Sequence, residues 1–153
     1  MTDSARTDDT TGFTDKMLLE LARDTRKVAY SPYSNFTVGA ACRARSGTAY
    51  FGCNVENSSY PVGICAERAA AACAIAHGEE EIDTIAIAGG NRDDQPSGDL
   101  RPCGMCLQFL SEIMDPDGRI LIADGIDGSV EFTLGDLLPH AFVMKGGEGQ
   151  EDQ

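Results

Sequence analysis

The sequence predicts an α/β fold in which helices cover a β-sheet within a single domain. Segments with helical spacing alternate along the chain with short β-branched apolar runs, an order typical of layered α/β domains. The length of 153 residues is that of one ordinary domain. A chain of this size buries roughly 68–70% of its unfolded surface, so it builds a core without disulfides. We expect the domain to span 14–142, between polar tails at 1–13 and 143–153.

In the first half of the chain, spacing and turn residues indicate one helix and a hairpin. Apolar residues recur at helical spacing after Thr14, which is a suitable N-cap. Turn-forming residues at 31–35 end this pattern, and alternating β-prone residues follow. The predicted elements are a helix over 14–29, strands over 36–43 and 48–53, and a hairpin turn at Ser46-Gly47.

In the second half, helices again alternate with buried strands. An Ala-rich helix is closed by Gly78 at its C-cap, and a β-branched run ended by Gly89-Gly90 predicts a strand buried on both faces. Pro102 marks the start of a third helix. The predicted elements are helices over 65–77 and 102–114, strands over 82–88, 120–123 and 130–132, and a helical turn over 133–138.

The charge balance restricts the partners. Twelve Lys and Arg residues stand against 25 Asp and Glu residues, for a net charge of −13. Such a surface repels phosphate backbones and anionic headgroups, so we expect a small uncharged ligand and neither a nucleic acid nor a membrane as partner. The N-terminal residues have none of the basic start and apolar run of a signal peptide. We therefore expect a cytoplasmic protein with reduced thiols.

Three of the six cysteines are placed to hold a metal ion. Cys103 and Cys106 are three residues apart at the start of a predicted helix, so they share one face. Cys65 lies at the start of another helix, and the partial positive charge of a helix N-terminus favours the thiolate form. Zinc is the natural ion for such thiolates, and three protein ligands leave the fourth tetrahedral position for water.

Two other interpretations of these cysteines stay open at this point. A Cys-x-x-Cys pair alone also occurs in redox proteins. If Cys53 completed a four-cysteine site, the metal would be structural and the protein a binding module. The combination of Cys65-Ala66-Glu67 with 102–106 favours an enzyme, because it is the three-cysteine form of the zinc deaminase signature. We interpret Cys42, Cys53 and Cys73 as structural.

The chain resembles the small, tetrameric type of cytidine deaminase from about Ala29 to Phe142. The resemblance implies a three-layer α/β/α domain with a mixed five-stranded sheet, one zinc ion per subunit, and a homotetramer with shared active sites. The motifs that carry it are Tyr30–Ala40, Gly52–Asn57, Tyr60–Arg68, Pro102–Cys106 with Gln108, and Leu137–Phe142.

The resemblance also implies an activity. It is the hydrolytic deamination of cytidine and deoxycytidine to uridine and deoxyuridine with release of ammonia, a step of pyrimidine salvage. A zinc-bound hydroxide would attack C4 of the base, and Glu67 would carry protons between the water, the ring and the leaving amine. Three thiolates on one divalent cation leave a net charge of −1, which Arg68 would offset through hydrogen bonds to the sulfurs.

By the same resemblance, Asn54 and Glu56 would bind ribose hydroxyls, Phe36 would face the pyrimidine, and Ala66 would contact the substrate. Phe142 would reach the active site of a neighbouring subunit. From the residues alone, Asn54 also suits a turn, and both phenylalanines also suit a core.

Two positions depart from the usual pattern of the family, because Leu107 stands where Arg is common and Thr37 where Pro is common. The first leaves Arg68 with more of the neutralising charge. Relatives within the deaminases act on blasticidin, guanine or nucleic-acid bases. Residues 54–57 favour a free nucleoside because their proposed partners are sugar hydroxyls.

Overall fold

Five strands form one mixed sheet in the order β2-β1-β3-β4-β5. Strands β3 and β4 are parallel, and the other neighbouring pairs are antiparallel. The computed structural model describes residues 12–145, and the parts of the expected tails at 1–11 and 146–153 lie outside it. The strands are β1 (Phe36–Ala44), β2 (Ala49–Cys53), β3 (Ile82–Asn91), β4 (Arg119–Asp124) and β5 (Gly128–Thr133).

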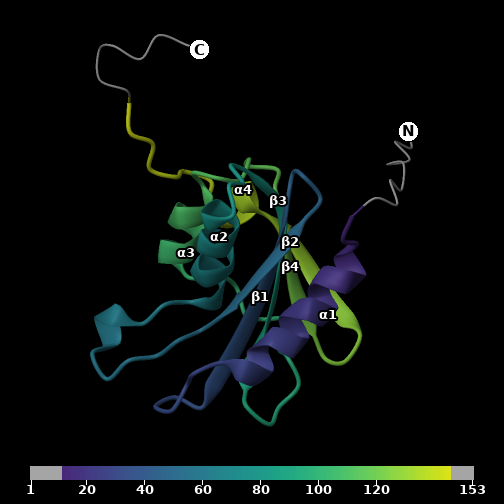
Figure 1. Cartoon of the computed structure of the whole chain (residues 1–153), viewed down its shortest axis with the longest axis vertical. Helices are drawn as coiled ribbons and strands as arrows, with labels where there is room; N and C mark the ends of the chain where they lie inside the picture. Colours follow the sequence, from purple (N-terminus) through teal and green to yellow (C-terminus); the bar gives the residue numbers. More distant parts are fainter. Residues whose placement is uncertain (1–11, 146–153) are drawn as a thin grey trace.

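Helices cover both faces of this sheet. Helix α1 lies on one face, and α2 and α3 lie together on the opposite face (Figure 1). The predicted three-layer α/β/α arrangement with a mixed five-stranded sheet is therefore confirmed. The helical elements are α1 (Asp15–Thr25), η1 (Arg26–Val28), η2 (Tyr60–Val62), α2 (Ala66–Ala76), α3 (Gly104–Leu110) and α4 (Leu134–Leu137). Among the described residues, no helix is long and apolar enough to cross a membrane.

The central strand β3 supplies side chains to both layers of the core. Ile85 and Ile87 belong to the apolar cluster beneath α2 and α3, whereas Ala86 and Ala88 belong to the cluster beneath α1. Successive side chains of a strand point to opposite faces, so one β-branched run serves both clusters. The prediction of a strand buried on both faces is confirmed.

The strand β3 is longer than the sequence predicts. We expected Gly89-Gly90 to end it, but both glycines lie within the strand and pair with β1. A Cβ atom at Gly89 would overlap the side chain of Leu100. Glycine at this position therefore lets the following loop approach the sheet closely, and it does not interrupt the ladder.

The helix α3 is shorter than predicted. Pro102 precedes it, Cys103 is its N-cap, and it ends at Leu110, four residues before the predicted end. The backbone carbonyl of Ile113 accepts a hydrogen bond of 2.9 Å from the amide of Ile82. This bond ties the chain after α3 to the start of β3, so residues 111–114 form turns instead of further helix.

Candidate active site

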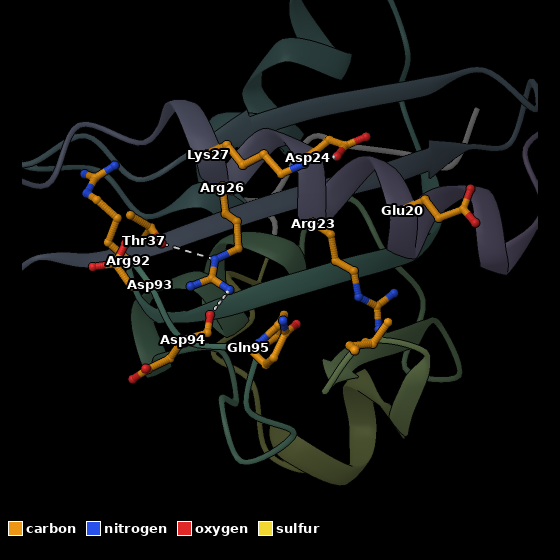
Figure 2. A pocket seen from close by; sticks show the side chains of 12 residues that line it. Glu20, Arg23, Asp24, Arg26, Lys27, Thr37, Arg92, Asp93, Asp94 and Gln95 are labelled. Carbon is orange, nitrogen blue, oxygen red and sulfur yellow. Dashed lines mark hydrogen bonds and ion pairs between the residues drawn. The ribbon is translucent and has the colours of Figure 1, made fainter.

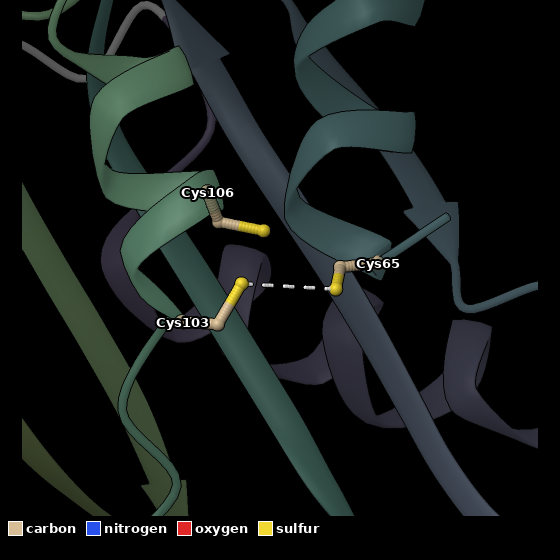
Figure 3. Close-up of side chains that lie close together, drawn as sticks. All are labelled: Cys65, Cys103 and Cys106. Carbon is tan, nitrogen blue, oxygen red and sulfur yellow. Dashed lines mark hydrogen bonds between the residues drawn. The ribbon is translucent and has the colours of Figure 1, made fainter. Parts of the chain in front are cut away.

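Two helix starts bring three sulfur atoms together. Cys65 is the N-cap of α2, Cys103 is the N-cap of α3, and Cys106 lies in the first turn of α3. Their Sγ atoms lie within 4.8 Å of one another, and those of Cys65 and Cys103 are 4.0 Å apart (Figure 3). Within residues 12–145, this is the one group of three or more His, Cys, Asp or Glu side chains whose ligand atoms are close enough to hold a metal ion.

The thiols share their protons unequally. The pKa of Cys65 is lowered to about 5, first because the Cys106 thiol donates a hydrogen bond to it and then because Arg68 does so too. The pKa of Cys106 is raised, chiefly by that same hydrogen bond to Cys65 and by burial. The first thiolate therefore forms readily, whereas further ionisation requires a cation to offset the accumulating charge.

The position of Arg68 fits a site of three thiolates around zinc. Its hydrogen bond to Cys65 is the largest cause of its raised pKa, against a smaller opposing effect of burial. Its buried Nε atom has no hydrogen-bond partner among the described residues. Leu107, which departs from the pattern of the family that the sequence resembles, is buried in the core beside α2. A zinc ion with three thiolates carries a net charge of −1, which the Arg68 cation offsets.

Glu67 is a buried acid next to the sulfur cluster. It occupies the first turn of α2, directly after Ala66, and 6% of its surface is exposed. Burial raises its pKa to about 7, because desolvation penalises the charged form. A carboxyl group with a pKa near neutrality both accepts and donates protons at physiological pH, which is the property that a general acid–base catalyst needs.

A cavity of about 600 Å³ opens in front of the sulfurs. Among the predicted site residues, Asn54, Glu56, Cys65, Arg68 and Cys103 line it. Ala66, Glu67 and Cys106 are buried at the ends of α2 and α3 that face this cavity. The structure thus brings the proposed metal ligands and sugar contacts to one cavity.

Besides Ala66, two other predicted substrate contacts do not line this cavity. Phe36 begins β1, and its backbone carbonyl accepts a hydrogen bond from the Asn54 side chain. Phe142 is 68% exposed and borders a separate cavity of about 230 Å³ beside Leu138. The Gln108 side chain holds it there, because its Nε2 donates to the Phe142 carbonyl at 2.9 Å and its Oε1 accepts from the Phe142 amide at 3.0 Å.

The two predicted sugar contacts are held in different ways. The Asn54 amide bonds to the β1 backbone at both ends, accepting from the Val38 amide at 2.8 Å and donating to the Phe36 carbonyl at 2.9 Å. The Glu56 carboxylate accepts from the Ser34 hydroxyl and from the amides of Tyr33 and Ser34. These hydrogen bonds lower the pKa of Glu56, and the bond from the Ser34 hydroxyl has the largest effect. The carboxylate therefore remains ionised and can accept hydrogen bonds.

Several residues at this cavity have no predicted role in the sequence analysis. Tyr33 and Ser34 hold Glu56, and Tyr60 and Met105 line the cavity. The turn-forming run 31–35 was the available signal for the first two. Its residues are close to Glu56 only after β1 and the segment after β2 come together, which spacing along the chain does not reveal.

The remaining cysteines do not join the sulfur cluster formed within the described chain. The thiol of Cys53 faces the Val28 carbonyl at 4.0 Å, so the four-cysteine alternative has no support in this arrangement. Cys42 is fully buried, and burial raises its pKa to about 12. Cys73 is half-buried, with its Sγ 3.8 Å from Nδ1 of His77.

A larger cavity, of about 810 Å³, lies elsewhere, between α1 and residues 92–96. Figure 2 shows Arg26 at its centre, bonded to Thr37 and Asp94. Arg26 also donates to the Asn91 carbonyl at 2.8 Å. This guanidinium is occupied with neighbouring protein groups, so cavity size alone does not identify the reactive site.

The fold is a three-layer α/β/α domain with a mixed sheet, and two of its helices begin with cysteines whose sulfurs converge beside a buried Glu. This combination of fold and site defines a zinc-dependent deaminase. The family model described as "Cytidine and deoxycytidylate deaminase zinc-binding region" matches residues 13–121. The chain belongs to the cytidine deaminase family.

Individual relatives agree with this assignment. Cytidine deaminase from Halalkalibacterium halodurans is 36% identical over 131 residues, which cover 85% of this chain and 95% of the relative. The crystal structure of cytidine deaminase from Burkholderia pseudomallei is similar with a TM-score of 0.77 and 39% identity, over 85% of this chain and all of that one. The enzyme from Mycobacterium tuberculosis gives a TM-score of 0.71 and 36% identity, over 86% and 100% of the two chains.

Proposed function

We propose that the protein hydrolyses cytidine and deoxycytidine to uridine and deoxyuridine with release of ammonia, as a step of pyrimidine salvage. The observation that carries this proposal is the position of Glu67, buried with a raised pKa beside three convergent sulfurs and a cavity of nucleoside size. Membership of the cytidine deaminase family supports the same chemistry.

The proposed mechanism uses Glu67 to move protons. Cys65, Cys103 and Cys106 would hold a zinc ion, which would supply a Lewis acid that makes water at this position more acidic. Glu67 accepts a proton from the attacking water and delivers it to N3 of the base as the new C4–O bond forms. Glu67 then takes the second proton of the former water from the new C4 hydroxyl and passes it to the amine as the C4–N bond breaks, so C4 becomes a carbonyl and ammonia departs.

The remaining residues of the proposed site hold the metal centre and the nucleoside. Arg68 offsets the net negative charge of the zinc thiolates through hydrogen bonds to their sulfurs. Glu56 and Asn54 bind the sugar hydroxyls, Glu56 as an acceptor and Asn54 through its remaining amide hydrogen. We expect Ala66 and Phe36 to contact the pyrimidine, although neither side chain lines the cavity of about 600 Å³ within the described chain.

We propose that a homotetramer completes the site, with Phe142 of one subunit reaching the cavity of another. The support is the exposed apolar surface at the cavity and the C-terminal segment: Tyr60 is 77% exposed, Met105 64% and Phe142 68%. Large exposed apolar groups around a ligand site mark an interaction surface. We further propose that residues 14–142 form the whole catalytic domain and that the protein acts in the cytoplasm.

A side-by-side absorbance assay tests the proposed function. Cytidine, deoxycytidine, cytosine, blasticidin S and deoxycytidylate are offered to the zinc-loaded protein under identical conditions. We expect the protein to consume cytidine and deoxycytidine. We also expect the active protein to contain one zinc ion per chain. Turnover of cytosine alone would contradict the sugar contacts, and full activity in protein without stoichiometric zinc would contradict the metal site.

A further inference from the structure

The loop of residues 29–35 forms one wall of the proposed sugar site, although it contributes no predicted contact of its own. It connects η1 to β1. The middle of the loop supplies three donors to the Glu56 carboxylate, namely the amides of Tyr33 and Ser34 at 3.1 Å and the Ser34 hydroxyl. The position of Glu56 in the cavity therefore depends on the position of this loop.

A side chain from the far end of β3 holds both ends of the 29–35 loop. The Arg92 guanidinium donates to Ser31 Oγ at 3.0 Å and to the Ala29 carbonyl at 3.4 Å, near the beginning of the loop. At the other end, its Nε donates to Asn35 Oδ1 at 3.3 Å, and its backbone amide donates to the Asn35 carbonyl at 3.0 Å.

The residues that Arg92 holds are conformationally demanding. Asn35 has a φ of +57°, in the left-handed region that residues other than glycine adopt at a cost. Ser31 is 1% exposed, and its carbonyl accepts a hydrogen bond of 3.0 Å from the Asn35 amide, which closes the loop. Hydrogen bonds from the Arg92 guanidinium keep this loop in one conformation, because they stabilise a backbone state that is otherwise weakly populated.

Arg92 borders the cavity of about 810 Å³ beside α1, but its guanidinium group points away from the other arginines of that cavity. In Figure 2 it extends away from the guanidinium groups of Arg26 and Arg23. Arg23 lines the same cavity and donates instead to the carbonyls of Gly125 at 3.4 Å and Gly128 at 2.9 Å, at the two ends of the β4–β5 turn. The two arginines therefore hold different loops, and only the loop held by Arg92 contacts Glu56.

We propose that Arg92 is a positioning residue for nucleoside recognition: it holds the 29–35 loop so that Tyr33 and Ser34 orient Glu56 towards a sugar hydroxyl. The proposal rests on the proposed function, in which Glu56 binds that hydroxyl. Arg92 acts through the loop and does not touch the substrate. Its effect belongs to substrate binding, since it is remote from Glu67 and the sulfurs.

The test separates binding of the sugar from the chemical step. For Arg92→Ala, we expect KM for cytidine to rise about tenfold, the size of one or two lost charge-assisted hydrogen bonds, with kcat changed by less than about twofold. The Ki of 2′,3′-dideoxycytidine, measured as a competitive inhibitor, should stay within about twofold, because this probe lacks the 2′ and 3′ hydroxyls, at least one of which Glu56 binds in the proposal. Arg92→Lys should give an intermediate KM, since an ammonium group reaches Ser31 but not Asn35 at the same time.

Two further measurements distinguish positioning from general destabilisation. Arg23→Ala is the matched control, and it should lower the thermal midpoint without changing the ratio of KM to the dideoxycytidine Ki. In a Glu56→Gln background, Arg92→Ala should add little to KM. An unchanged ratio in Arg92→Ala, or an equal change in Arg23→Ala, would overturn the proposal while wild-type cytidine turnover stands. Absence of wild-type turnover would instead refute the proposed function.

Discussion

On one face of the sheet, α1 lies against alanine and glycine, whereas on the other face α2 and α3 lie against isoleucine and carry the reactive groups. On the α1 face, Ala41, Ala86 and Ala88 form the floor. The helix approaches so closely that a Cβ atom at Gly39 would overlap the Ala22 carbonyl and the Arg26 amide. This face is built for close contact between backbones.

The face beneath α2 and α3 has a different composition. Ile85, Ile87 and Ile120 fill the space under the helices. At the ends of these helices, Glu67 is buried with a raised pKa and Arg68 has a buried Nε without a partner among the described residues. Burial of such groups costs stability unless a ligand or metal satisfies them. The comparison teaches that both faces contribute stability, and that the face beneath α2 and α3 uses some of it to hold reactive groups ready.

Replacing Glu67 should give the largest effect and should be confined to activity. Glu67→Gln keeps the shape of the side chain but removes proton transfer, so kcat should fall by about 10²–10⁴. Zinc content and the thermal midpoint should not fall, because the three sulfurs remain and an uncharged amide is easier to bury. Steady-state kinetics and metal analysis measure this. Glu80→Gln, an exposed acid after α2, is the matched control. Substantial residual turnover would refute the role of Glu67.

Mixing subunits tests whether the α2–α3 face is completed by another copy. Phe142→Ala and Glu67→Gln chains should each have low activity alone. When the two chains are co-expressed, a site with an intact Glu67 from one chain meets an intact Phe142 from the other, so activity should exceed the sum of the separate preparations. Merely additive activity would show that each site is complete within its own chain.

A substitution on the α1 face should affect stability and leave the chemistry intact. Gly39→Ala forces a methyl group into the backbone of α1, and we expect a loss of about 3 kcal/mol, the upper part of the usual range for overpacking. In a domain of this size, the thermal midpoint should fall by about 6–12 °C. The folded fraction should retain its kcat. Gly104→Ala is the stability control. A Cβ atom at Gly104 would have no neighbouring atom within 4 Å, so this variant should not lower the thermal midpoint. Equal midpoints for the two variants would contradict the close contact at Gly39.

Local signals in the sequence predicted most elements because those signals act over short distances. Thr14 accepts from the Met17 amide as an N-cap, and Gly78 has a φ of +90° after α2, as expected for a glycine that ends a helix. Two of the boundaries that differ, the end of β3 and the end of α3, were set by contacts distant in sequence. The side chain of Leu100 packs against Gly89, which lies inside β3. The amide of Ile82 donates to the carbonyl of Ile113, which follows α3.

By itself, the sequence determined the donor chemistry of the site: the pair Cys103 and Cys106, the preceding Cys65-Ala66-Glu67, and the turn residues of the 29–35 loop. These depend on residue type and on spacings within one turn of helix, which folding does not change. Only the tertiary structure decided that Cys65 lies 4.0 Å from Cys103, that Glu67 is buried, and that Arg92 reaches the loop holding Glu56. Each of these joins segments separated by many residues or depends on what surrounds a side chain, so it follows from how helices and strands assemble on the sheet.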